Sequence, residues 1–513
     1  MPAPARRWVG AGAPTRRQEL NVSATAFAFF AIAVAAVLVR FWSLQTQPGG
    51  LYPDEAAEGV DARRLIADPG FHPVFFDDDG GREALYAYVT ATAFRVFGAS
   101  VTTLRGTSAA LGVLGVALIW LAVRRYGRGA ALAAMAWSAG SLWLIAVSRD
   151  GFRNILVVPA GALALLAMLR WADRPSRVSA LAAGGAMGLG LWTYQPLKFL
   201  PLLAIVWLLW MRRRDRERYA RLRATFAWCI AAYLIVAAPI IWTAITDARN
   251  YFGRGAVVSV FNPGVSTQDS YPVQVLRTLG MFLVTGDPNA RHDVNALPLL
   301  GPLLFIPFAF GMARAVKRRD DHGHVMLLLG IVVFLIPPLI APEGYAPHFL
   351  RSLGLAPFVA ALVGIGCVEI VSLAGLVPRA PRPARAVAAT ACTTLIAVLG
   401  VLSIRTYLDR PVNQRYDAYS FADVELAAAA DQGEGTVAVI DEYNSLDVQF
   451  LDANNMPTVQ PPGRPLAHPR VYSLIVAASR AEIAGAVDAA TAARATVAAV
   501  DPRGNPVVWE VVP

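Results

Sequence analysis

Long apolar segments run through most of this sequence, and they restrict its fold more than any other feature. Taking a membrane-spanning helix as about twenty apolar residues, the candidates are roughly 22–43, 103–123, 130–147, 155–172, 178–194, 197–211, 223–245, 297–315, 324–341, 352–376 and 385–404. Hydrophobic residues make up 56% of the 513 residues and charged residues 16%, a balance typical of polytopic membrane proteins and not of large soluble enzymes. We therefore predict a mainly α-helical membrane bundle of about eleven spans.

The short apolar segment 84–97 decides how these spans are oriented. Its fourteen residues would form about 21 Å of helix, against a hydrocarbon core of about 30 Å. When this segment is left out of the count, the basic clusters between the spans fall on the same side as the basic N-terminus. These clusters lie at 124–128, 173–177, 212–223, 314–319 and 379–385. Segment 84–97 is therefore predicted to be a surface helix, with the N-terminus in the cytoplasm and the C-terminal region outside.

This orientation divides the chain into a cytoplasmic tail (1–21), a transmembrane domain (22–404) and an extracytoplasmic domain (405–513). In the last part, apolar runs alternate with alanine-rich stretches, which predicts a small α/β domain with about four short strands and two or three helices. The runs lie at 436–440, 471–477, 495–500 and 507–512. This domain either binds an acceptor or forms a structural cap. The net charge of +10 comes from clusters between apolar runs, so it indicates topology and no nucleic-acid partner.

Two adjacent acids follow the first span, in the motif Tyr52-Pro53-Asp54-Glu55. Pro53 suits the first turn of a helix, which we expect to run to about Ala67, and acidic residues are favoured near a helix N-terminus. In one interpretation, these acids only cap and solubilise that helix. In the other, one of them acts as a general base on an acceptor hydroxyl or amine held at the bilayer surface.

Other outer segments gather side chains that suit an anionic ligand. Arg149, Asp150 and Arg153 lie close together between two spans, where the arginines either snorkel to the interface or contact phosphate oxygens. Asp150 would orient or assist the acceptor. Lys198 lies at an outer mouth, where snorkelling and a carrier phosphate explain it equally well. A last outer segment, 342–351, contains an acid, a phenol, an imidazole and a guanidinium, which are Glu343, Tyr345, His348 and Arg351.

The segment 246–296 is long, and we expect it to form a second surface helix within 271–284 and a lid-like loop. His292-Asp293 in this loop is a weak candidate for a metal or substrate pair. The chain lacks a Walker sequence, a Ser-His-Asp elbow and a His-Glu-x-x-His motif, which argues against nucleotide-driven chemistry on the cytoplasmic side. The spans hold almost no ionisable residues at mid-membrane depth, which argues against the rival function of a transporter or flippase for a lipid-linked or polar solute.

The order of these motifs resembles the GT-C class of membrane glycosyltransferases, and it is most similar to the dolichyl-phosphate-mannose protein mannosyltransferase and aminoarabinose transferase branch. The resemblance covers about residues 22–210. It comprises Tyr52-Pro53-Asp54-Glu55, Gly81-Arg82-Glu83-Ala84-Leu85-Tyr86, Thr103-Leu-Arg105, Arg124-Arg125-Tyr-Gly, Ser148-Arg149-Asp150 and, later, Pro347-His348-Phe-Leu-Arg351. Glu83-Ala84-Leu85 departs from the pattern, because many relatives have two prolines after the charged residue.

The resemblance implies an inverting transfer of a sugar from a polyprenyl-phosphate carrier to an acceptor outside the cytoplasm. It implies that Asp54 is the base, Glu55 a supporting acid and Asp150 a second-loop acid. The candidates for the carrier phosphate are then Arg149, Arg153, Lys198, His348 and Arg351. We expect no metal or other cofactor. The expected partners are the lipid-linked donor, membrane lipid and an acceptor whose class the sequence leaves open, with the site on the outer face of the plasma membrane.

Overall fold

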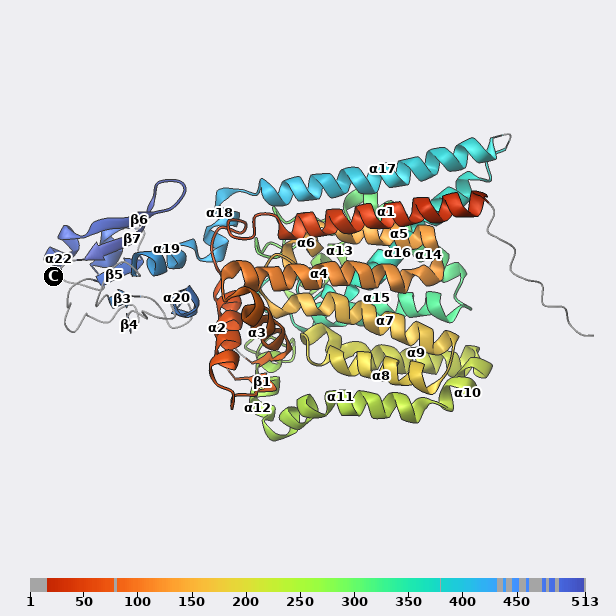
Figure 1. Cartoon of the computed structure of the whole chain (residues 1–513), viewed down its shortest axis with the longest axis horizontal. Helices are drawn as coiled ribbons and strands as arrows, with labels where there is room; N and C mark the ends of the chain where they lie inside the picture. The colour runs from red at the N-terminus through yellow and green to blue at the C-terminus, as the bar shows by residue number, and fades with distance from the viewer. Residues whose placement is uncertain are drawn as a thin grey trace, which may run out of the picture.

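The computed structural model describes residues 16–77, 81–378, 380–430, 437–439, 445–451, 458–460, 473–476, 479–484 and 489–511. The long helices form one bundle with roughly common direction, and a small sheet-containing unit stands beyond one end of it (Figure 1). We call this end, where α2 also lies, the site end. Of the expected cytoplasmic tail, residues 1–15 lie outside the described residues, and the first helix, α1, already begins at Arg16.

All eleven predicted spans are helical. They correspond to α1 (Arg16–Phe41), α4 (Val101–Val123), α5 (Arg128–Gly140) with α6 (Leu142–Val147), α7 (Val157–Asp173), α8 (Arg177–Gly190), α9 (Leu200–Arg214), α11 (Phe226–Thr246), α14 (Gly301–Lys317), α15 (His322–Ile340), α16 (Ala356–Ala374) and α17 (Pro381–Leu408). Within the described ranges, seven helices are long and apolar enough to cross a membrane by themselves: those containing α1, α4, α7, α11, α15, α16 and α17. The prediction of a mainly α-helical membrane bundle is confirmed.

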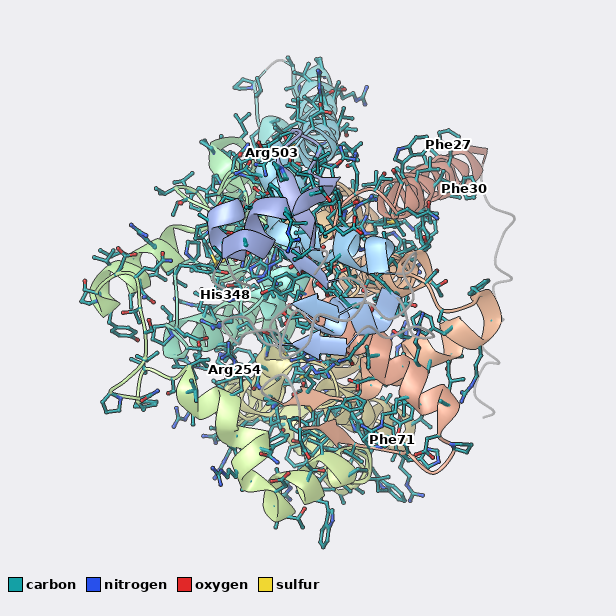
Figure 2. All side chains as sticks on the ribbon, turned by 90° about the vertical axis from the view of Figure 1, so that its left-hand side faces the viewer. Phe27, Phe30, Phe71, Arg254, His348 and Arg503 are labelled. Atoms are coloured by element: carbon teal, nitrogen blue, oxygen red, sulfur yellow. The ribbon has the colours of Figure 1, made fainter. Side chains whose placement is uncertain are left out.

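The bundle has a buried centre and an apolar periphery. Most of α7 and α16 is buried, and together they supply much of the core. In contrast, α1, α11 and α17 lie at the edges of the bundle and expose large apolar side chains. Phe27 and Phe30 of α1 point away from the bundle and are 75% and 66% exposed (Figure 2). Apolar side chains on that surface suit contact with lipid.

The predicted span 130–147 is interrupted in the structure. Ser141 adopts extended backbone angles between α5 and α6, so the segment forms two helices. At this break Gly140 meets Gly400 of α17 so closely that an added Cβ would lie 2.7 Å from the Gly400 Cα. This contact therefore joins two glycines that lie far apart in the sequence.

Short elements cover the site end of the bundle (Figure 1). Helix α2 runs from Pro53 to Ala67, as predicted from its proline. Helix α3 (Leu85–Phe97) is 13 residues long, shorter than a membrane crossing requires, and it matches the predicted surface helix 84–97. Between them, β1 (Phe75–Phe76) and β2 (Arg82–Glu83) form an antiparallel pair. Two further short helices, α12 (Ala248–Val257) and α13 (Tyr271–Gly280), lie in the loop before α14.

The C-terminal unit contains a five-stranded sheet in the order β4-β3-β5-β7-β6. Strands β3 (Val437–Val439), β4 (Thr458–Gln460) and β5 (Ser473–Val476) are parallel, while β6 (Thr496–Val500) and β7 (Pro506–Val511) pair antiparallel. Its helices are α18 (Val412–Arg415), α19 (Phe421–Ala430), α20 (Ser445–Leu451), α21 (Arg480–Ile483) and α22 (Ala489–Arg494). The four predicted apolar runs correspond to β3, β5, β6 and β7, and the short strand β4 was not predicted.

Candidate active site

A cavity of about 830 Å³ opens at the site end, between the start of α2, the turn before α9, helix α12 and the segments that precede α14 and α16. Five of the eight predicted site residues line it: Asp54, Arg153, Lys198, His348 and Arg351. Figure 2 views the molecule from this end and shows Arg254 and His348 on it. Glu55, Arg149 and Asp150 are not among its lining residues.

Asp54 reaches the cavity from the first turn of α2. Its carboxylate lies 3.7 Å from the guanidinium of Arg291, which comes from the loop before α14. The same guanidinium lies over the ring of Tyr52, 3.3 Å from the ring centroid. A cation held between an acid and an aromatic face is well fixed in position. Asp54 therefore meets the cavity beside a positive charge.

A buried network of charges fixes the two basic residues on the α2 side of the cavity. Glu83 lies 3.1 Å from the amine of Lys198 and 3.7 Å from Arg153, and Arg153 also donates a 3.2 Å hydrogen bond to Glu58. Buried charges require such partners, because an unpaired charge is costly in a medium of low polarity. This network joins three acids and three bases: Glu58, Asp61, Glu83, Arg82, Arg153 and Lys198.

A second group of charges lies on the opposite wall. Both terminal nitrogens of Arg254 donate to the carboxylate of Glu343, at 3.2 and 3.0 Å. Arg351 donates to the same carboxylate at 3.0 Å and to the Glu343 carbonyl at 3.0 Å. One acid thus holds two guanidinium groups side by side at the cavity surface, an arrangement that suits planar, bidentate recognition of an anion.

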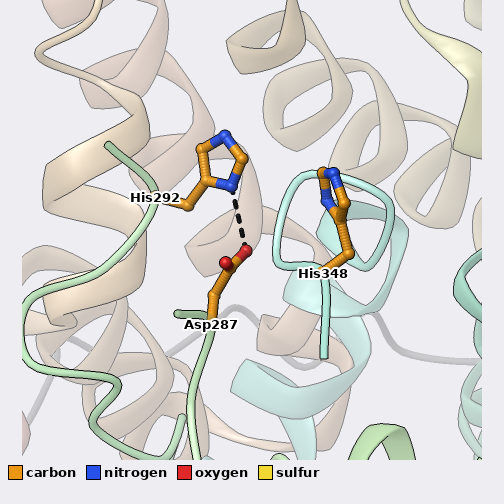
Figure 3. A group of neighbouring side chains, drawn as sticks. All are labelled: Asp287, His292 and His348. Atoms are coloured by element: carbon orange, nitrogen blue, oxygen red, sulfur yellow. Dashed lines mark hydrogen bonds and ion pairs between the residues drawn. The ribbon is translucent and has the colours of Figure 1, made fainter. Parts of the chain in front are cut away.

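Two imidazoles complete the lining. His292 Nδ1 lies 2.9 Å from Asp287 Oδ2, and His348 lies beside this pair (Figure 3). The His348 ring is tilted by 36° against that of His292 and stacks on the nearly parallel ring of Tyr345. Burial lowers the pKa of both histidines, so both are neutral near pH 7. The ligand atoms of Asp287, His292 and His348 all lie within 4.8 Å of one another. Among the described residues, this cluster is the one group of three or more such side chains that could hold a metal ion.

The pairing within this loop differs from the expectation from sequence. The weak candidate pair was His292 with Asp293, its neighbour in the chain. In the structure the partner of His292 is Asp287, whose Oδ2 also accepts a hydrogen bond from the Phe349 amide. Asp293 instead accepts a hydrogen bond from the Val294 amide. Asp287 therefore connects the loop before α14 to segment 342–351.

The three predicted site residues outside the cavity lining have other partners. Glu55 is buried, accepts a 3.0 Å hydrogen bond from Nε of Arg105 and forms an ion pair with its Nη2 at 2.9 Å. Arg149 is fully buried and donates to four backbone carbonyls of residues 39–47. Asp150 is 6% exposed and accepts a 3.0 Å hydrogen bond from the Tyr419 hydroxyl. Burial, reinforced by Glu55, raises the pKa of Asp150 to about 7.

Sequence reasoning did not identify Arg291 and Arg254 as site residues. Both lie in the long segment 246–296, for which only a lid-like loop and the weak candidate pair His292-Asp293 were predicted. A signal was present, because Arg291 directly precedes His292 in a loop rich in polar residues. With these two, five basic side chains line the cavity against two carboxylates, Asp54 and Glu343. The lining therefore favours an anionic ligand, and one of its carboxylates, Asp54, lies outside the Arg254–Glu343–Arg351 group.

Comparisons with known proteins agree with this architecture. Residues 83–242 match the family model described as dolichyl-phosphate-mannose-protein mannosyltransferase. The structure is similar to ArnT from Cupriavidus metallidurans, with TM-scores of 0.61 for the form bound to undecaprenyl phosphate and 0.62 for the apo form. In both comparisons 14% of residues are identical, and the match covers 95% of this chain and 98% of that chain.

A second structural neighbour is the Archaeoglobus fulgidus oligosaccharyltransferase tethered to an acceptor peptide. Its TM-score is 0.54 at 14% identity, and the match covers 86% of this chain and 64% of that chain. No curated protein sequence matches the chain. At this level of identity, the likeness to both structures is one of fold.

Proposed function

We propose that this chain transfers a sugar from a polyprenyl-phosphate carrier, with inversion, to an acceptor on the outer face of the plasma membrane. Its fold is that of the GT-C membrane glycosyltransferases, and its family match indicates a glycosyltransferase. One observation carries this proposal. A cavity at one end of a membrane bundle places the carboxylate of Asp54 among five basic side chains.

The basic lining supports a lipid-linked phosphate as donor. The tail of such a donor lies in the bilayer, so its phosphate and its reactive sugar carbon lie at the membrane surface. When the bond between sugar and phosphate breaks, negative charge develops on the leaving phosphate, and preorganised cations stabilise that charge. Arg153, Lys198, Arg254 and Arg351 are held in place by acids for this task. The similar ArnT structure with undecaprenyl phosphate supports the same class of ligand.

Asp54 is the proposed general base. Inversion requires one displacement, in which the acceptor attacks the sugar carbon opposite the phosphate and loses a proton to a base. Asp54 lies in the cavity, whereas Glu55 and Asp150 do not line it. In this mechanism Arg291 holds the base in position, and the other cations hold the leaving group. Bringing donor, acceptor and base together supplies orientation.

The experiment measures sugar transfer in membranes that contain the wild type, Asp54→Asn or Asp68→Asn, at matched protein levels. Donors are a panel of labelled polyprenyl-phosphate sugars, and transfer is followed as label that leaves the donor for another membrane or soluble product. Asp68 lies at the other end of α2 and is bonded to the Gly70 amide, so the control makes the same substitution outside the cavity. We expect Asp54→Asn to lower the rate by at least about 100-fold and Asp68→Asn to leave it near that of the wild type.

Two results would contradict the proposal. Undiminished transfer by Asp54→Asn would remove Asp54 as the base. No transfer from any donor by the wild type, together with movement of a solute across the membrane, would favour a transporter instead.

A further inference from the structure

The segment that follows the last long helix, α17, contacts loops of the candidate site. Residues 409–421, which we call the strap, follow α17 and contain α18. The strap contacts three loops that are far apart in the sequence and that all carry or flank site residues. These are residues 42–52 before Asp54, the turn at Asp150, and the loop 286–297 that carries Arg291 and His292.

Contacts with the first loop are close and mainly involve the backbone. Arg415 donates two hydrogen bonds, at 3.2 and 2.9 Å, to the carbonyl of Thr46, and its own carbonyl accepts one from the Gly49 amide. A Cβ on Gly49 would lie 2.3 Å from the Tyr416 ring, and one on Gly50 would lie 1.9 Å from the Tyr419 carbonyl oxygen. Only glycine permits this approach. The residues directly before Tyr52 and Asp54 are therefore packed against the strap.

Contacts with the loop 286–297 come from side chains of the strap. Gln414 Nε2 donates to Asn295 Oδ1 at 2.9 Å, and the backbone amide of Asn295 donates to Gln414 Oε1 at 3.2 Å. Farther along the strap, the fully buried Tyr419 hydroxyl shares its one proton in a three-centre hydrogen bond with Asp150 Oδ1, at 3.0 Å, and the Arg291 carbonyl, at 3.3 Å. One hydroxyl thus bridges the Asp150 turn and the backbone of Arg291.

Arg410 holds Tyr419 from the other side. Its guanidinium lies 3.9 Å from the centroid of the Tyr407 ring and 5.6 Å from that of Tyr419, and it donates to the Tyr419 hydroxyl at 3.5 Å. A hydroxyl that receives one hydrogen bond donates its own more strongly. The orientation of the Tyr419 hydroxyl is therefore set by the protein and not by solvent.

From these contacts we infer that Tyr419 is a positioning residue for the reaction: its hydroxyl fixes the backbone of Arg291 and thereby keeps the Arg291 guanidinium against Asp54. The inference rests on the proposed function, because it concerns the step for which Asp54 is the base. Tyr419 is not among the residues that line the cavity. Its effect passes through Arg291, so it acts on the rate of the chemical step more than on donor binding.

The test compares the wild type with Tyr419→Phe, which keeps the buried ring and removes only the hydroxyl. The matched control is Tyr416→Phe, because the ring of Tyr416 contacts Phe421 and Gly49 while no hydrogen bond within the described part of the chain involves its hydroxyl. Initial rates of sugar transfer are measured against donor concentration. We expect Tyr419→Phe to lower kcat roughly tenfold with donor KM within about twofold of the wild type, and Tyr416→Phe to change neither.

A second measurement does not depend on activity. The amides of His292 and Asp293 donate to the Asn289 carbonyl, at 3.0 and 3.1 Å, so their hydrogen exchange reports whether this turn is held. Exchange at 289–293 should accelerate in Tyr419→Phe and not in Tyr416→Phe, at an unchanged unfolding temperature. Wild-type kcat in Tyr419→Phe, or unchanged exchange at these amides, would overturn the inference. A wild type that transfers no sugar while Tyr419→Phe still accelerates exchange would contradict the proposed function and leave the strap contact established.

Discussion

Arg149 donates from both terminal nitrogens to the carbonyls of Val39, Arg40, Trp42 and Gln47, which lie at and just after the end of α1. The last carbonyls of a helix lack partners within the helix, and a buried guanidinium satisfies several of them at once. Both terminal nitrogens are thus committed to the backbone. In the structure Arg149 holds the end of α1, whereas Arg351 lines the cavity.

We predict that Arg149→Gln lowers the free energy of unfolding by roughly 3 kcal/mol and leaves the KM for the donor near that of the wild type. Arg351→Gln should show the converse, with a clearly higher donor KM and a smaller loss of stability. Thermal unfolding in detergent and initial transfer rates give the two quantities. An Arg149→Gln protein with normal stability and a raised donor KM would indicate that Arg149 binds the donor phosphate.

Asp150 provides a prediction about pH. Its carboxyl group faces Glu55 from α2, Arg105 from α4, and Arg410 and Tyr419 from the strap, and burial raises its pKa to about 7. Because the ordinary value is 3.8, the folded protein retains a proton between about pH 4 and 7 that the unfolded chain releases. Asp150 therefore favours folding most at low pH, and this contribution is lost as the pH rises through that window.

The variant Asp150→Asn cannot ionise and lacks this pH dependence. Between pH 5 and 7 the stability of the wild type should fall relative to that of Asp150→Asn, by at most about 1.4 kcal/mol per pH unit. Unfolding temperatures of both proteins across this range provide the measurement. Parallel curves for the two proteins would mean that Asp150 ionises in the folded state as it does in water.

At the scale of single elements, helix α2 contacts both the cavity and the C-terminal unit. Asp54 in its first turn faces the cavity, while Gly59 lies against the ring of Phe450 in α20 of the C-terminal unit. A Cβ on Gly59 would lie 2.4 Å from that ring. Phe450 also packs against Arg63 of α2 and Phe94 of α3. The C-terminal unit is therefore docked on the helix that carries the proposed base.

We predict that Gly59→Val displaces α20, because the valine side chain and the Phe450 ring need the same space. Amide hydrogen exchange in residues 445–451 should accelerate, and the free energy of unfolding should fall by roughly 1–3 kcal/mol. Gly185→Val in α8 is the control, since a Cβ there meets no atom within 4 Å. Equal effects of the two substitutions would show that lost glycine, and not a lost contact with α20, is responsible.

The sequence predicted elements well where their cause is local. A proline at the first helical position set the start of α2, and continuous apolar runs set the eleven bundle segments. The break at Ser141 and the strand β4 both involve contacts with distant parts of the chain. Gly140 meets Gly400 at the break, and β4 is three residues long and pairs with β3.

The same distinction between local and non-local causes explains which site residues the sequence predicted. Adjacent residues of a helix point about 100° apart, so Asp54 and Glu55 meet different surroundings. Only tertiary structure shows that Asp54 faces the cavity and that Glu55 meets Arg105. Arg291 and Asp287 were missed as site residues because their partners, Asp54, His292 and the Phe349 amide, identify them only after the loops have met. Residue type indicated the chemistry of the site. The choice among similar residues required the fold.

On the scale of the whole molecule, the two ends of the bundle carry separate clusters of charged residues. The cavity and its acids and bases lie at the site end, while a different cluster ties loops at the other end of the bundle. There Arg125 bonds Asp173 and Asp321, at 2.9 Å each, and Asp173 also accepts from His322. Basic residues outnumber acids in the loops at this other end, as in segment 212–223. The excess of positive charge favours this end as the cytoplasmic one.

Cysteine labelling tests this orientation in intact cells. Ser479→Cys places a thiol at an exposed position of the C-terminal unit, and Arg213→Cys places one at the end of α9, at the opposite end of the bundle. A membrane-impermeant maleimide should label the first without permeabilisation and the second only after it. The unmodified chain gives the background from Cys229, Cys367 and Cys392, all of which lie within bundle helices. The reverse pattern would place the cavity on the cytoplasmic side. A donor whose sugar lies at the outer leaflet could not then reach Asp54. The proposal of transfer on the outer face would be wrong, even if Asp54 proved essential.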